Sequence, residues 1–380
     1  MFSVRFCDTH TKANIPLSSF VVVVKVGGGR ISAMGKIQFT HGYHYIISLE
    51  NLLEAWQEFL CGKRQRQDVQ EFEHNLMTNV IALHNELINF TYRHSGYKAF
   101  KISDPKPRDI HKASVRDRLL HHAIYRQLYP FFNRTFIADS YSCRNNKGTH
   151  KAINRFRSMS YQVSKNNTKT CWVLKCDIRK FFASIDHDIL KSILAEYIPD
   201  RNILWLLNRV IDSFEVAPNK GLPLGNLTSQ LFVNVYMNEF DQFVKHELKQ
   251  RYYIRYADDF AFLSDDKQEL ANIIKSVHEF LGKKLELQIH PNKISLSTLA
   301  SGVDYLGYVH FPKYRILRTK TKKRALYLVN HKNLSSYLGV CQHANAFDAE
   351  RELVNRVLRG LGSTSKCNTS AKIEVYDIYP

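Results

Sequence analysis

Two adjacent aspartates, Asp258 and Asp259, occupy the middle of the stretch RYADDFAFLS, residues 255–264. Runs of β-forming residues flank them and the short ADD segment has turn chemistry, so the stretch predicts a β-hairpin with both acids at its tip. Neighbouring carboxylates repel each other unless they share a proton or meet a cation, so the pair indicates a metal site. The alternative is an ordinary solvated turn, because aspartate is a favoured turn residue.

A third aspartate, Asp177, ends a second predicted strand in LKCDIRKFFASIDHDIL, residues 174–190. A lone carboxylate at a buried strand end is costly. Two strands that each bring aspartate to one sheet edge can bind two divalent ions, such as Mg²⁺, that align a hydroxyl with a nucleoside triphosphate. The alternative is that Asp177 only caps a local turn, although Asp186, followed by HDIL, is the better helix cap.

The charge of the chain is strongly positive: 54 Lys and Arg stand against 35 Asp and Glu, which gives +19 and a pI near 9.5. Residues 140–176 and 305–347 contain no acid, and these two basic zones flank the acidic pair in a pattern typical of a template channel. The alternative is that such charge runs are solvated faces. The residues predicted to bind nucleic acid are Arg144, Lys147, Lys151, Lys320, Lys322 and Lys323.

Other sequence patterns argue against several classes of protein. The apolar run FVVVVKV, residues 20–26, is too short to span a bilayer and contains Lys25. No signal peptide is recognisable, and seven cysteines without a C-x-x-C pair indicate reduced thiols in a cytoplasmic protein. The histidines form no metal-binding motif.

The periodicity of the chain predicts helices alternating with antiparallel β segments, which is an α+β architecture. Helices are expected from Ser48 onwards and over residues 68–89, 186–198, 226–248 and 268–284. Strands are expected in the first half of residues 97–128, before a helix, and at residues 170–185, 252–263 and, as a pair, 303–317. Residues 1–47 suggest one or two strands around a triple-glycine turn, and the basic C-terminal part is expected to be helical.

In order and spacing, several motifs over residues 48–350 resemble the reverse transcriptases. YADD (256–259) resembles the motif on the palm hairpin, CDIRKFF (176–182) the palm strand that carries the first metal ligand, and VDYLGY (303–308) the primer grip. The resemblance implies a right-hand polymerase fold. Its parts would be an N-terminal extension (1–47), fingers with the start of the palm (48–169), the palm (170–310) and a basic helical thumb and tail (311–380).

The resemblance also implies roles for individual residues. Two Mg²⁺ would be held by Asp177, Asp258 and the carbonyl of Ile178, with Asp259 as an outer or transient ligand. Lys106 and Arg108 in DPKPRDI would hold the triphosphate, unless they are exposed fingers charges. Lys293 would protonate pyrophosphate, unless it is a plain surface lysine. The remaining assignments are Phe182 as a steric gate against a 2′-hydroxyl, with Phe181 in the core; Leu224, Gly225 and Gln230 beside the nascent base pair; and Tyr305, Leu306 and Gly307 as the primer grip.

One subgroup is closer than the rest. In GLPLGNLTSQ, residues 221–230, Leu224 replaces the usual Gln and Gln230 the usual Pro, as in the reverse transcriptases of diversity-generating retroelements. That resemblance implies cDNA synthesis from a retroelement template RNA with errors at template adenines. The implied partners are a structured retroelement RNA and a basic, oligomeric accessory variability protein. The alternatives are a group II intron-like or defence-associated reverse transcriptase, or a non-catalytic RNA-binding scaffold.

Overall fold

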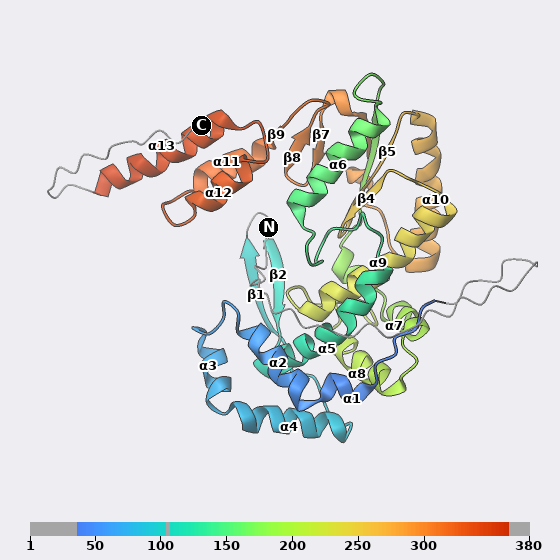
Figure 1. The fold of residues 1–380 in the computed structure, drawn as a ribbon, viewed down its shortest axis with the longest axis vertical. Coiled ribbons are helices and arrows are strands. Elements are labelled where there is room, and N and C mark those ends of the chain that lie inside the picture. The colour runs from blue at the N-terminus through green and yellow to red at the C-terminus, as the bar shows by residue number, and fades with distance from the viewer. Residues whose placement is uncertain (1–35, 104–106, 365–380) are drawn as a thin grey trace, which may run out of the picture.

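The computed structural model describes residues 36–103 and 107–364, which form an α+β protein (Figure 1). Its N-terminal part is helical apart from one antiparallel hairpin. The elements are α1 (Tyr43–Ile47), α2 (Leu49–Leu60), α3 (Gln67–His74), α4 (Leu76–Ile88), β1 (Lys98–Ser103), β2 (Pro107–Lys112) and α5 (Val115–Thr135).

Local signals located most of these elements. The Ser48 hydroxyl accepts the N–H of Asn51 and so caps α2, as its sequence predicts. The single helix predicted over residues 68–89 is wrong, because Asn75, at φ −116° and ψ 35°, separates α3 from α4. Hydrophobic periodicity continues across that break, so it could not reveal it.

The expected N-terminal extension is only partly described. The predicted strands and glycine turn within residues 1–35 lie outside the described residues. Residues 36–47 do not stand apart: Phe39, Ile46 and Ile47 are buried in the main core with the helices that follow. This segment therefore belongs to the body of the protein.

A four-stranded antiparallel sheet forms the centre of the predicted palm, in the order β4-β5-β3-β6. Its strands are β3 (Trp172–Asp177), β4 (Tyr253–Tyr256), β5 (Asp259–Ser264) and β6 (Ser295–Thr298). The β4–β5 hairpin is the one that RYADDFAFLS predicts. Strand β3 pairs with β5 on one side and β6 on the other, so segments distant in sequence meet at its end.

Helices surround this sheet: α6 (Thr149–Val163), α7 (His187–Tyr197), α8 (Arg201–Ile211), α9 (Leu227–Gln242) and α10 (Lys267–Leu285). Asp186 caps α7 by accepting the N–H groups of Asp188 and Ile189, as predicted. The long helix expected over residues 226–248 instead changes at Phe243 into a π-helical turn, Phe243–Glu247. No helix in the described part of the chain is long and apolar enough to cross a bilayer.

The C-terminal part contains a small sheet followed by helices. Three strands, rather than the predicted pair, form the order β7-β8-β9. The elements are β7 (Val303–Tyr305), β8 (Tyr308–His310), β9 (Arg315–Leu317), α11 (Thr319–Leu328), α12 (Leu334–Cys341) and α13 (Phe347–Thr364). The helices lie at one end of the molecule in Figure 1, next to this sheet.

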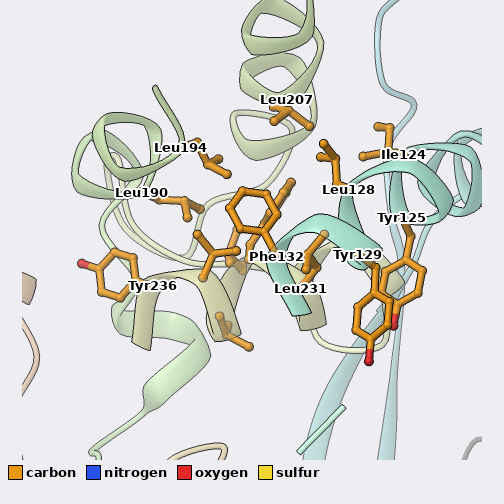
Figure 2. Close-up of a cluster of buried hydrophobic side chains, with 14 of the residues drawn as sticks. Ile124, Tyr125, Leu128, Tyr129, Phe132, Leu190, Leu194, Leu207, Leu231 and Tyr236 are labelled. Carbon is orange, nitrogen blue, oxygen red and sulfur yellow. The ribbon is translucent and has the colours of Figure 1, made fainter. Parts of the chain in front are cut away.

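Two hydrophobic cores hold these parts together. The larger joins the N-terminal helices to one face of the palm sheet. Figure 2 shows its centre, where Phe132 of α5 lies among side chains of α7, α8 and α9 such as Leu194, Leu207 and Leu231. The smaller core packs α6 and the other face of the sheet against the C-terminal part. The palm sheet is thus buried on both faces, which fixes the strand ends that carry the acids.

Candidate active site

The three predicted aspartates meet at one end of the palm sheet. Asp177, the last residue of β3, lies directly opposite Asp259, the first residue of β5. The N–H of Ile178 donates to the carbonyl of Asp258 at 3.2 Å, which ties the strand end to the hairpin turn. Ala257 in that turn has a left-handed backbone with φ 55°. The antiparallel register therefore brings together acids that are far apart in sequence.

The electrostatics of this cluster favour a cation. Burial, together with the neighbouring charges of Asp259 and Asp177, raises the pKa of Asp258 to about 6. Burial also raises the pKa of Asp259, whereas Lys175 lowers it. Each additional negative charge in this half-enclosed cluster is unfavourable until a positive charge balances it.

Two lysines already balance part of this charge. The Nζ of Lys293 lies 2.5 Å from Oδ1 of Asp177, and that of Lys175 lies 3.7 Å from Oδ1 of Asp259. Lys293 reaches Asp177 because the N–H of His290 donates to the Asp177 carbonyl and anchors the loop before β6. Lys293 is therefore an ion-pair partner of a site carboxylate, and its acid role stays a prediction. Sequence reasoning missed Lys175, although residues two apart on a strand share a face.

The donor set suits Mg²⁺, which prefers carboxylate, carbonyl and water oxygens. Asp177 and Asp258 supply carboxylates, and the carbonyl of Ile178 accepts no hydrogen bond from the described residues. Among the described residues, no group of three or more Asp, Glu, His or Cys side chains is arranged so that it could hold a metal ion. A Mg²⁺ ion bound by these oxygens would need phosphate or water oxygens to complete its octahedral shell.

Phe182 follows the site in a short 3₁₀ turn, Phe181–Ser184. The Phe181 side chain is buried, as predicted, whereas Phe182 is partly exposed at the edge of the core. The N–H of Leu222 donates to the Phe182 carbonyl at 2.8 Å, so the turn is fixed beside the GLPLGN loop. This placement permits the steric-gate role, which stays a prediction.

The GLPLGN loop, residues 221–226, is hydrogen-bonded to the β1–β2 hairpin, which lies in the predicted fingers and is called the fingers hairpin below. The N–H of His111 in β2 donates to the Leu224 carbonyl at 3.1 Å, and the Asn226 amide donates to the His111 carbonyl at 3.0 Å. Gly225 has φ +103°, and a Cβ there would lie 3.0 Å from Cγ2 of Ile110. The structure thus requires glycine because β2 approaches, a reason that the sequence did not supply. Gln230 is partly buried in the first turns of α9.

Arg108, one of the two predicted phosphate ligands, lies in the same hairpin. Arg108 is exposed on β2, where it pairs with Ile102 across the hairpin. Lys106 lies outside the described residues. The triphosphate role of both residues stays a prediction.

The predicted primer-grip residues lie in the small C-terminal sheet and the turn between β7 and β8. Tyr305 is fully buried and its ring stacks on Phe156 of α6, while Leu306 is only 7% exposed. Both side chains are therefore part of the core in this structure, and the primer-grip role stays a prediction. Leu306 and Gly307 form a tight turn with φ 51° and 92°, and the Gly307 carbonyl accepts the N–H of Arg318. Their visible role is to hold the small sheet against α11.

The predicted nucleic-acid-binding residues also differ among themselves. The Arg144 guanidinium donates to the carbonyls of Asn133, Ile137 and Ser140, so it ties its loop to the end of α5, and its role in binding nucleic acid stays a prediction. Lys147 and Lys151 each donate to one loop carbonyl but lie nearer the solvent. On α11, Lys322 lies 3.6 Å from Glu352, whereas the other two predicted lysines are exposed. Those two are Lys320 and Lys323.

Several known proteins are similar to this chain in sequence. Protein YkfC of Escherichia coli K12 is 24% identical in an alignment 259 residues long that covers 58% of this chain and 66% of YkfC. The putative COX1/OXI3 intron 2 protein of Saccharomyces cerevisiae is 20% identical over 53% of this chain and 30% of its own length. The group II intron-encoded protein LtrA of Lactococcus lactis is 24% identical over 49% of this chain and 30% of LtrA. The chain thus covers less than two thirds of these relatives.

Two telomerase structures also match. That of Candida tropicalis has a TM-score of 0.44 and 13% identity over 60% of this chain and 55% of its own. That of Candida albicans has a TM-score of 0.47 and 11% identity over 72% of this chain and 57% of its own. Residues 101–310 match the family model described as reverse transcriptase (RNA-dependent DNA polymerase), and they include the three aspartates, the GLPLGN loop and β2. This chain belongs to the reverse transcriptase family and has its right-hand polymerase fold.

Proposed function

We propose that this chain is an RNA-directed DNA polymerase that copies a template RNA into cDNA from deoxynucleoside triphosphates. The observation that carries the proposal is the meeting of Asp177 with Asp258 and Asp259 at the end of a sheet that is buried on both faces. Maintaining three clustered acids is costly unless they bind cations. The +19 charge of the chain suits a nucleic-acid partner.

In this proposal Asp177, Asp258 and the Ile178 carbonyl hold two Mg²⁺, which supply charge stabilisation for phosphoryl transfer when bound. Arg108 and Lys106 hold the triphosphate, and Phe182 excludes a 2′-hydroxyl from the sugar site. Lys293, beside Asp177, donates the proton that the leaving pyrophosphate needs.

Replacing Asp258 by Asn tests the proposal. We expect Mg²⁺-dependent primer extension on an RNA template to be abolished, because a metal ligand is lost, while RNA affinity is retained because the basic surface is unchanged. Asp265→Asn is the matched control: it removes one carboxylate just beyond the other end of β5, where Asp265 faces Lys169 at 3.8 Å. Extension by Asp258→Asn within about tenfold of the wild type would contradict the assignment and favour a non-catalytic scaffold.

We further propose that the enzyme belongs to a diversity-generating retroelement and copies template adenines unfaithfully. The LGNLTSQ form of the loop supports this proposal. The Leu224 carbonyl in this loop accepts the N–H of His111 in β2, at the point where the proposed fingers meet the palm. The corresponding partners are a structured retroelement RNA and a basic accessory variability protein.

A second candidate is an intron-associated reverse transcriptase. The similarity to an intron 2 protein of yeast mitochondrial COX1 and to the group II intron-encoded protein LtrA favours it. The error spectrum of the purified enzyme distinguishes the two candidates. Errors concentrated at template adenines support the retroelement assignment, and an even spectrum supports the intron-associated one.

A further inference from the structure

Arg255 is a fully buried cation three residues before Asp258, with 1% of its surface exposed. Its Nε and one terminal nitrogen bind both carboxylate oxygens of Asp241 on α9, at 2.8 and 2.6 Å. That same terminal nitrogen also donates to the hydroxyl of Ser140 at 3.2 Å. Asp241 is fully buried and also accepts the hydroxyl of Tyr253 at 2.8 Å.

The remaining terminal nitrogen of Arg255 points to the turn between β4 and β5, which contains Ala257 and Asp258 and is called the catalytic turn below. It donates to the carbonyl of Ala257 at 3.2 Å and lies 3.4 Å from Oδ1 of Asn234. Ala257 has φ 55°, a left-handed conformation that residues other than glycine rarely adopt. The guanidinium thus bonds to the carbonyl of the one residue in the turn that adopts this unfavourable geometry, immediately before Asp258.

The chemistry of the Arg255–Asp241 ion pair indicates that it fixes the position of the turn. A buried ion pair adds little net stability compared with apolar residues of similar size, because two charges must leave water. Only arginine has five N–H donors in a planar fork, and here they bind Asp241, Ser140, Asn234 and the turn at once. A lysine could balance the charge of Asp241 but could not also bind the Ala257 carbonyl in the same arrangement.

We propose that Arg255 is a positioning residue, oriented by Asp241, that fixes the backbone of the catalytic turn and so places the carboxylate of Asp258. The proposal rests on the proposed polymerase function for its effect on turnover. The structural part of the proposal, that Arg255 makes the turn rigid, is tested without any measurement of activity.

Two variants separate positioning from stability. Arg255→Lys keeps a cation beside Asp241 but loses the fork. The double variant Arg255→Met with Asp241→Leu removes both charges together and is expected to restore thermal stability to near the wild-type value. Arg155→Lys is the matched control, because Arg155 forms the same kind of fork with Asp139, next to Ser140, without reaching the turn.

We expect both Arg255 variants to lower kcat for primer extension by about tenfold or more, with little change in KM for the nucleotide or in RNA affinity. We also expect faster hydrogen exchange at the turn and at the Ile178 amide, which bonds to Asp258, in the stably folded double variant. The control should keep wild-type kcat and exchange. Activity that returns with stability in the double variant, or unaltered exchange at the turn, would overturn the proposal.

The two readouts also keep the claims apart. If the wild-type protein fails to extend primers, the proposed function fails. The exchange experiment then still decides whether Arg255 fixes the turn.

Discussion

The three site carboxylates differ in their surroundings. Lys293 pairs with Asp177 and Lys175 faces Asp259, whereas no described lysine or arginine lies within ion-pair distance of Asp258. Asp258 also has the pKa that is raised to about 6, chiefly by burial. A bound cation would balance the charge of Asp258, which no described lysine or arginine pairs with, so its replacement is a sharp test of metal-dependent chemistry.

At the same scale, Leu224→Gln tests the adenine-specific proposal. A glutamine can hydrogen-bond near the incoming nucleotide, so a mispair that breaks this contact is penalised by about 1 to 3 kcal/mol, whereas leucine offers only shape. We expect the variant to retain extension and to misincorporate less opposite template adenine than the wild type, with smaller changes opposite other bases. Sequencing cDNA from one template measures this.

Leu204→Gln is the control for that experiment, because it places the same side chain on α8, away from the loop. An adenine error spectrum that is unaltered by Leu224→Gln would remove Leu224 from the explanation of infidelity.

At the scale of elements, the junction between β2 and the loop before α9 joins the fingers hairpin to the palm. This junction consists of two hydrogen bonds with His111 and the close approach of Ile110 to Gly225. Any shift of β2, which carries Arg108, is thereby transmitted to the backbone of Leu224. The phosphate-binding and base-pair regions of the proposed site are thus mechanically connected.

Gly225→Ala tests this junction. The added methyl meets Ile110 at 3.0 Å and forces alanine to φ +103°, so we expect a loss of stability of about 1 to 2 kcal/mol, measured by denaturant unfolding. Gly282→Ala in α10 is the control: a methyl group added there would meet nothing within 4 Å, and we expect a gain of about 0.5 to 1 kcal/mol. Equal stabilities of Gly225→Ala and the wild type would show that β2 does not constrain this loop.

At the scale of the whole molecule, charge is distributed unevenly. The palm sheet end gathers acids, while the C-terminal helices present exposed lysines such as Lys320 and Lys323 on α11. An RNA bound along this surface would release counterions from several phosphates together.

Replacing Lys320 and Lys323 by Ala tests that arrangement. We expect the slope of log affinity for structured RNA against log salt concentration to become shallower by about 1.4 to 1.8, the value for two lost phosphate contacts. The double variant Lys283→Ala, Lys284→Ala removes the same charge from the exposed end of α10 and should leave the slope unchanged. An identical slope for the α11 variant and the wild type would mean that α11 does not contact RNA.

The sequence by itself determined the features that depend on neighbouring residues. Caps such as Ser48 and Asp186 act within one helical turn, and the YADD hairpin is encoded by its own alternation and turn, so both were predictable. The family motifs likewise identified Asp177 and Asp258 as the acids that meet. Local sequence patterns indicate which residues are buried and which form hydrogen bonds within one turn, and this is enough to predict the helix or strand that carries such a residue.

Only the tertiary structure decided which distant groups meet. Periodicity marks a residue as buried but does not show which residues bury it, so it could not show that Tyr305 packs on Phe156 of α6. Nor could it show that Lys293 pairs with Asp177, or that Arg255 spans from Asp241 to the Ala257 carbonyl in the turn between β4 and β5. These contacts follow from strand order and from packing between segments far apart in the chain, and such long-range choices leave no repeating signal in the sequence.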